Sequence, residues 1–272
     1  MVQTLLAKAL LPLLSASALV LAVVPAKAQI ATFATFASIN STKNIQFQNE
    51  GTSDTRSNDA LLFTTPSGSA TNLGSTQVSF SFLQPGLSSY VNNVVANFTM
   101  SAAVAKNDTV DAFGNALFQP ILSGSMSFTT TTAITVTSPY FSTHTYAPGA
   151  NLLTVVFDGS LYGTRNGSTA NLGGSTLGGN NLLFTSDFLD FSNVVNADLA
   201  AAFTALNSGL KVGSNGSLAS FRATGGGQFS ADPVPNIIGM IPEPASWAMM
   251  IAGFGMLGVA ARRHAKAAHA PV

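Results

Sequence analysis

Apolar and polar residues alternate with a period of two along most of the middle of this chain. Residues 78–83 (VSFSFL) alternate almost throughout, residues 94–100 do so more loosely, and residues 125–138 are rich in β-branched side chains. The same character continues in residues 152–164, 182–195 and 217–231. Because successive side chains of a strand point to opposite faces, this period predicts strands with one buried face.

Short clusters of Pro, Gly and Asn separate these segments. They are Pro66-Ser67-Gly68, Pro85-Gly86, Pro148-Gly149, Asn166-Gly167, Asn180-Asn181 and Asn215-Gly216. Asn-Gly between alternating segments is a strong signal for a hairpin turn. Strands at this spacing predict an all-β fold, a β-sandwich or jelly-roll-like domain over residues 29–241.

Two segments fit this pattern less well. Residues 196–210 (NADLAAAFTALNSGL) have good helix propensity and also alternate as Leu199, Ala201 and Phe203. We predict a strand there, because a lone helix must find a place on a sandwich, and we keep the helix as the alternative. Residues 30–57 are weakly patterned and are interpreted as an edge strand followed by a loop.

One pair of segments suggests an internal repeat. Residues 62–74 (LFTTPSGSATNLG) and 161–173 (LYGTRNGSTANLG) align without gaps and share seven identities in thirteen positions. In a composition so rich in Gly, Ser, Thr and Asn this match carries little weight. A two-fold duplicated sandwich is therefore held as an alternative to a single domain.

The N-terminus has the features of a secretory signal peptide. Lys8 precedes a largely apolar run over residues 9–24, and Ala26-Lys27-Ala28 supplies the small-x-small pattern that signal peptidase accepts. Residues 1–28 are therefore expected to be removed. The mature chain then begins at Gln29, outside the cytoplasm.

The C-terminus carries an uncharged segment of eighteen residues, 244–261, between Glu243 and Arg262. As a helix this segment would be about 27 Å long, close to the hydrocarbon thickness of a bilayer. A helix that is apolar all round is most easily covered by lipid. We predict a single transmembrane helix over about residues 245–261.

Basic residues fix the orientation expected for that helix. Arg262, Arg263 and Lys266 follow it, so the positive-inside rule predicts that the tail, including residues 267–272, is cytoplasmic. Everything before Glu243 is then outside the inner membrane. Trp247 falls near the outer interface, where an indole ring is favoured.

Together these features resemble the PEP-CTERM sorting signal in its PEPxxWAMM variant. The resemblance lies within residues 242–266, in the triplet Pro242-Glu243-Pro244, in Trp247 with the Ala-Met-Met that follows, and in Arg262-Arg263. It implies a temporary anchor recognised at the triplet by exosortase, a membrane-embedded cysteine transpeptidase that cuts nearby. It also implies a Gram-negative bacterium that makes extracellular polysaccharide. The tail from His264 onward is longer than this family leads us to expect.

The same segment contains a G-x-G-x-x-G pattern, Gly253 to Gly258, which is the fingerprint of dinucleotide binding. That fingerprint requires a preceding strand, a following helix and an acidic residue about twenty positions later. Here a Pro-rich linker precedes the pattern and the chain end follows it. The glycines instead suit contact with another membrane helix.

Charge and composition narrow the function classes. Residues 29–241 contain six cations against ten anions, nine of which are aspartates. A net negative domain argues against nucleic acid and against an anionic membrane surface as partners. The chain has no cysteine, so the exported domain must be held together by its core.

Candidate catalytic residues are few. His144 is the only histidine of residues 29–241, and a Ser-His-Asp triad would have to use it; we interpret it as a surface histidine beside Tyr140 and Tyr146. Asp187 and Asp190 are the best pair of carboxylates for sugar hydrolysis. Three positions apart on a strand, they would point to opposite faces and would not converge.

A calcium site is the one metal hypothesis. Asn107, Asp108, Asp111 and Asn115 fall within one expected loop, and hard oxygen ligands suit Ca²⁺. The same residue types are also common in turns. We therefore expect no cofactor and retain calcium as an alternative.

These features favour an exported, non-enzymatic cell-surface or matrix protein, associated with exopolysaccharide and biofilm. The first alternative is a lectin-like module that binds a glycan. Because the one Trp is in the expected span, sugar stacking would fall mainly to Tyr90, Tyr140, Tyr146 and Tyr162. A secreted glycoside hydrolase is the less favoured alternative.

Overall fold

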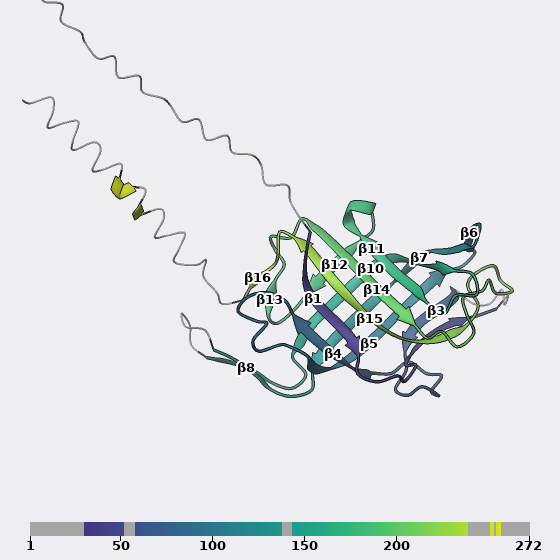
Figure 1. Cartoon of the computed structure of the whole chain (residues 1–272), viewed down its shortest axis with the longest axis horizontal. Helices are drawn as coiled ribbons and strands as arrows, with labels where there is room; N and C mark the ends of the chain where they lie inside the picture. Colours follow the sequence, from purple (N-terminus) through teal and green to yellow (C-terminus); the bar gives the residue numbers. More distant parts are fainter. Residues whose placement is uncertain (1–29, 52–57, 138–142, 239–250, 253, 257–272) are drawn as a thin grey trace, which may run out of the picture.

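The computed structural model describes residues 30–51, 58–137, 143–238, 251–252 and 254–256. The described residues are almost entirely β-structure (Figure 1). Eight strands make up most of the main antiparallel sheet: β1 (Ala31–Ser38), β4 (Thr76–Phe82), β5 (Val94–Ala105), β7 (Ala116–Thr130), β10 (Asn151–Thr164), β11 (Ala170–Ser175), β14 (Asn196–Thr204) and β15 (Phe221–Asp232). The remaining elements are β2 (Ile45–Asn49), β3 (Asn58–Thr64), β6 (Asp111–Phe113), β8 (Ile134–Val136), β9 (His144–Tyr146), the 3-10 turn η1 (Thr176–Gly178), β12 (Leu182–Thr185), β13 (Leu189–Asp190) and β16 (Asn236–Ile237).

Eight antiparallel strands form a closed ring. The order is β1, β4, β5, β7, β10, β11, β14 and β15, and β15 pairs again with β1. The prediction of an all-β fold is confirmed, but the arrangement differs from the predicted sandwich, because the ladder runs through one sheet that closes on itself. Long curved strands make this possible, since β5, β7, β10 and β15 each contact both neighbours over much of their length.

Pairs of short strands share the edges of single long strands. β15 pairs with β2 through Phe221–Ala223 and with β1 through Gly226–Ala231. In the same way β5 pairs with β4 at its beginning and with β3 at its end, and β10 pairs with both β11 and β12. The ring therefore stays closed along its length although several of its strands are interrupted.

The register of the strands defines two ends of the barrel. Ala31 pairs with Ala231, so the first strand begins where the last ring strand finishes. We call this the terminal end; it contains the connections 83–93, 131–137, 143–150 and 186–195. We call the opposite end the far end; it contains the connections 106–115, 165–169 and 205–220.

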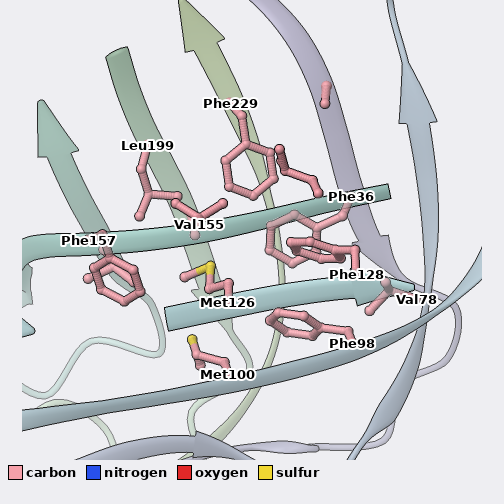
Figure 2. Close-up of a cluster of buried hydrophobic side chains, with 14 of the residues drawn as sticks. Phe36, Val78, Phe98, Met100, Met126, Phe128, Val155, Phe157, Leu199 and Phe229 are labelled. Carbon is pink, nitrogen blue, oxygen red and sulfur yellow. The ribbon is translucent and has the colours of Figure 1, made fainter. Parts of the chain in front are cut away.

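Phenylalanine rings fill the interior of the barrel. Phe128 is fully buried and lies against Phe98 at 4.7 Å, Phe36 at 4.9 Å and Phe80 at 5.3 Å between ring centroids. Figure 2 shows this cluster, with Met100 and Met126 beside the rings of neighbouring strands. Because the chain has no cysteine, this apolar packing takes the place of disulfides in holding the domain.

The two segments with weak patterns are both strands. Residues 196–204 form β14, which confirms the predicted strand, and Ala205 then turns the chain with φ of 55°. The interpretation of residues 30–57 as one edge strand and a loop was wrong in the number of strands. The segment contains both β1 and β2, which lie one after the other along β15 and so each have few residues to show an alternation.

The apparent internal repeat has no structural counterpart. Residues 161–173 form the β10–β11 hairpin, whose strands pair with each other. Residues 62–74 instead connect β3 to β4, which both pair with β5 rather than with each other. That connection is held by Arg222, whose guanidinium donates to the backbone oxygens of Gly68, at 2.6 Å, and Ala70. The structure gives a single ring, so the duplicated-sandwich alternative is not supported.

The two terminal predictions lie mostly outside the described residues. The signal peptide, with Ala26, Ala28 and Gln29, falls in the undescribed part of the chain. Of the expected span, residues 251–252 and 254–256 are described and are helical. Among all described residues, no helix has the length and apolar character needed to cross a membrane.

We expect Gly124→Ala to destabilise the barrel strongly. Gly124 on β7 faces Ala102 on β5, and a Cβ there would collide with Ser101 O and with the Cα and Cβ of Ala102. Overpacking of this kind costs about 1–3 kcal/mol. The matched control is Gly173→Ala on β11, where the new Cβ would meet nothing nearer than Tyr162 Cε1 at 3.7 Å. Urea unfolding should separate the two variants, and equal stability would contradict the close approach of β5 and β7.

Candidate functional site

The chain leaves the barrel through a short segment fixed to the terminal end. After β15, residues 235–238 are held by a two-residue antiparallel ladder in which Leu189 pairs with Ile237 and Asp190 with Asn236. Ile238 N–H donates to Phe188 O at 3.0 Å. We call residues 235–238, as held on β13, the clasp.

A buried amide completes the clasp. Gln84 is buried, and its Nε2 donates to Pro235 O at 2.6 Å. Asn193 Nδ2 approaches Val234 O at 3.4 Å, one residue earlier. Ile237 packs its side chain partly against the core. These contacts carry the described chain to Ile238, four positions before Pro242 of the expected sorting signal.

Charged residues are distributed unequally between the two ends. Asp187, Asp190 and Asp232 lie at the terminal end. The cations among the described residues lie elsewhere, in the connection after β1, at the start of β15 or at the far end; they are Lys43, Lys106, Arg165, Lys211 and Arg222. Among the described residues, the end from which the chain departs is therefore acidic.

Two rings of an aromatic stack, His144 and Tyr146, line a hollow of about 550 Å³ at the terminal end. The ring of Tyr146 stacks on Phe188 at 3.8 Å between centroids, and His144 meets Tyr146 edge-on at 4.4 Å. Burial of the phenol and the nearby charge of Asp187 raise the pKa of Tyr146. The structure thus places His144 beside Tyr146, as the sequence indicated, while Tyr140 lies outside the described residues.

The same hollow brings His144, Ser186 and Asp187 together, but the serine hydroxyl and the aspartate carboxylate have local partners. Ser186 Oγ donates to Leu152 O at 2.6 Å and accepts from Phe188 N–H at 3.0 Å. The Asp187 carboxylate accepts from Asn151 N–H at 2.7 Å. In this arrangement the serine hydroxyl links two chain segments, and its proton is directed to the backbone oxygen of Leu152.

The two carboxylates considered for sugar hydrolysis also have structural roles. Asp187 joins its loop to the start of β10, as above. Asp190 accepts from the backbone N–H of Ser192 at 2.9 Å and from its Oγ at 3.0 Å, and these hydrogen bonds lower the pKa of Asp190. Phe188 and Leu189 between them are buried, as expected for residues of the core.

A second hollow, a groove of about 640 Å³, crosses β1, β15, β14 and β11 on the side of the barrel, with Tyr162 of β10 at its margin. Small outward-facing residues form its floor and leave the space that the larger neighbours enclose. Ala200 and Ala202 of β14 point outward, while Leu199 and Phe203 point into the core. At Gly226 even a Cβ would lie 2.7 Å from Phe36 O, so β1 and β15 approach closely there.

The walls of the groove are neutral and able to form hydrogen bonds. The residues that line it carry hydroxyl or amide groups or no polar side-chain group, and none is charged. The polar residues are Thr35, Ser38, Asn40, Tyr162, Asn171, Thr204, Thr224 and Gln228. Tyr162 is 46% exposed and lies beside Gly173. The groove therefore offers an aromatic face and neutral hydrogen-bonding groups.

The tyrosines named for sugar stacking have different surroundings. Tyr162 lies at the groove. Tyr146 is part of the stack at the terminal end, and Tyr90 donates its hydroxyl to Thr137 O at 2.5 Å. Only Tyr162 among the described tyrosines lines this groove.

The residues of the calcium hypothesis lie at the far end. Asn107 has φ of 70° and its N–H donates to Asp59 Oδ2 at 2.7 Å, which is a turn role. Asp108 has one buried carboxylate oxygen without a hydrogen-bond partner, whereas Asp111 is exposed on β6 and Asn115 is exposed in the turn after it. No cluster of three or more His, Asp or Glu side chains suited to a metal occurs among the described residues. Calcium binding stays an untested alternative.

The sequence did not reveal the clasp or the groove. In the sequence Gln84 only precedes the Pro85-Gly86 turn, and no pattern distinguishes Pro235. The alternating pattern of residues 196–204 placed Ala200 and Ala202 on one face of a strand. The groove also requires β1, from the beginning of the chain, to lie beside β15, from its end. A run of three glycines, residues 225–227, was the one available signal.

Residues 241–263 match the PEP-CTERM protein-sorting motif. No curated protein and no solved structure matches the chain. The motif lies at the position where the sequence resembled this signal, and it indicates an exported protein that exosortase sorts at the membrane. The clasp ends at Ile238, three positions before the first residue of the motif.

We expect Asp187→Asn to lower the pKa of Tyr146 towards its ordinary value. The negative charge beside the phenol disappears, while the amide oxygen can still accept from Asn151 N–H; burial, the larger cause, keeps part of the increase. Ultraviolet difference titration, with Tyr146→Phe to assign the signal, measures this. Asp190→Asn is the control and should leave the titration of Tyr146 unchanged.

The same shift has a consequence for stability. Because the folded state favours the neutral phenol, the contribution of Tyr146 is fully present below its ordinary pKa of about 10 and is lost as pH rises through the folded-state pKa. Tyr146→Phe should remove this part of the alkaline loss of stability. If the loss of stability at alkaline pH is the same in Tyr146→Phe and in Asp187→Asn as in the wild type, burial and Asp187 do not raise the pKa of Tyr146.

Proposed function

We propose that this chain is an exported, non-enzymatic cell-surface or matrix protein that exosortase processes close to Pro242-Glu243-Pro244. The observation that carries the proposal is the sorting motif at residues 241–263, directly after a barrel with a packed interior. A non-enzymatic role is supported by the local hydrogen bonds of Ser186, Asp187 and Asp190, which leave these candidate groups in structural roles.

The chemistry of the motif suits presentation at a fixed depth. Pro242 and Pro244 donate no backbone hydrogen bond and each fixes φ near about −65°, which favours an extended triplet. Glu243 resists entry into lipid, and Arg262 with Arg263 resists passage outward through it. The segment between them is thereby held at one depth, so the same few peptide bonds face a membrane-embedded enzyme.

A tag placed after Val272 tests this proposal. In cells that contain exosortase, the mature protein should lose the tag, and Glu243→Ala should retain it because the triplet loses its charge. Immunoblotting of the tag and of the barrel measures both forms. In cells that lack exosortase the tag should be retained. A tag that stays on all of the mature protein in exosortase-containing cells would leave only a plain anchor.

Glycan binding is the second candidate function, and the groove favours it. An extracellular polysaccharide offers many hydroxyl groups and apolar sugar faces, which match neutral hydrogen-bonding walls and one exposed aromatic ring. The absence of charged residues from the lining fits a neutral glycan better than an acidic one. A glycan bound here would lie along the side of the barrel, clear of both ends.

We expect Tyr162→Ala to weaken such binding by roughly fivefold, since loss of one stacked aromatic face removes on the order of 1 kcal/mol. Affinity electrophoresis in gels that contain neutral dextran or the cell's own polysaccharide measures the change. Val156→Ala, an exposed outward position on the same strand but outside the groove, is the control. Equal retardation of wild type and Tyr162→Ala would rule out this groove as the site.

A further inference from the structure

The clasp is structurally separate from the ring. β13 and β16 pair only with each other among the described strands, so their ladder is not part of the closed sheet. It consists of two residue pairs, the Ile238 to Phe188 hydrogen bond and the Gln84 to Pro235 hydrogen bond. A unit with so few contacts opens locally at a free energy well below that of global unfolding. The barrel can therefore remain closed while the clasp opens.

The clasp limits how far the sorting motif extends from the folded domain. With the clasp closed, four residue steps separate Ile238 from Pro242, a reach of at most about 14 Å. With the clasp open, the last fixed residue is Asp232 at the end of β15, and the reach to Pro242 rises to at most about 36 Å. The motif thus lies close to the acidic terminal end unless the clasp opens.

We propose that the clasp is an autoinhibitory device that controls access of the membrane-embedded processing enzyme to the sorting motif. This inference rests on the proposed function. An enzyme that cleaves a peptide acts on chain that is free of folded structure, so the rate follows the population of the open form when opening is fast relative to cleavage. The closed clasp keeps the motif within a short reach of the barrel. Opening of the clasp releases residues 233–238 as additional extended chain between the barrel and the cleavage site.

The first test opens the clasp through one backbone group. Ile238→Pro removes the N–H that donates to Phe188 O, while the exposed Ile238 side chain has little role in the core. Loss of one net hydrogen bond should raise the open population, and with it the rate of C-terminal processing, by roughly 2- to 10-fold. Ile238→Ala keeps the N–H and is the matched control, which should be processed at the wild-type rate. Pulse-chase labelling with a tag after Val272 measures the rates.

The second test locks the clasp. Asp190 and Asn236 are paired across the ladder, where Cα atoms lie about 4.5–5.5 Å apart, within the range of disulfides. Because the chain contains no other cysteine, the double variant Asp190→Cys with Asn236→Cys forms one defined bond in the oxidising compartment outside the inner membrane. The locked protein should be processed at least about tenfold more slowly, with the rate restored by reductant. Each single cysteine variant is a control.

The outcomes separate this inference from the proposed function. If the wild-type tag is never lost in the presence of exosortase, the proposed function fails. If the wild type is processed but the oxidised double variant is processed equally fast, the clasp does not control access. Slower processing of Ile238→Pro than of Ile238→Ala would also overturn the inference, because the clasp would then present the motif.

Discussion

The pairing of the first strand with the last ring strand is the interaction on which the rest of the structure depends. β1 supplies one edge to β15 and the other to β4, and so closes the sheet. Closure removes the unpaired edges that an open sheet of this size would expose. It also encloses the phenylalanine cluster, because Phe36 of β1 meets Phe98, Phe128 and Phe229 from three other strands. Without disulfides, the fold relies on this enclosure.

Much of the fold was predictable from local pattern, and the closure was not. Alternation identified the strands around Phe80, Phe98 and Phe203, because each has a buried and an exposed face. Alternation does not identify partners, and the β1–β15 ladder joins residues about two hundred positions apart. The same limitation explains why residues 30–57 were predicted as one edge strand and a loop, since the feature that β1 and β2 share is their common neighbour β15.

The same distinction between local patterns and long-range contacts decides which candidate sites were predictable. The sorting motif was predictable because all of its residues lie in one continuous segment, from Pro242 to Arg263. The groove was not, because its small floor and Tyr162 come from strands that only the closed ring brings together. The clasp depends on one amide, Gln84, which lies about 150 positions from its partner Pro235. Asp190 shows the reverse case, since its role is a local turn with Ser192.

The meeting of Ala31 and Ala231 has a consequence for the order of events during export. A chain that crosses the membrane from its N-terminus delivers β1 first and β15 last. The ring cannot close until β15 has emerged, so folding of the barrel cannot be completed during translocation of its earlier strands. When β15 does emerge, the C-terminal segment is the next part of the chain to reach the membrane. The barrel's final ladder therefore forms only when the sorting motif is the next part of the chain to reach the membrane, so completion of the fold and presentation of the motif fall at the same stage of export.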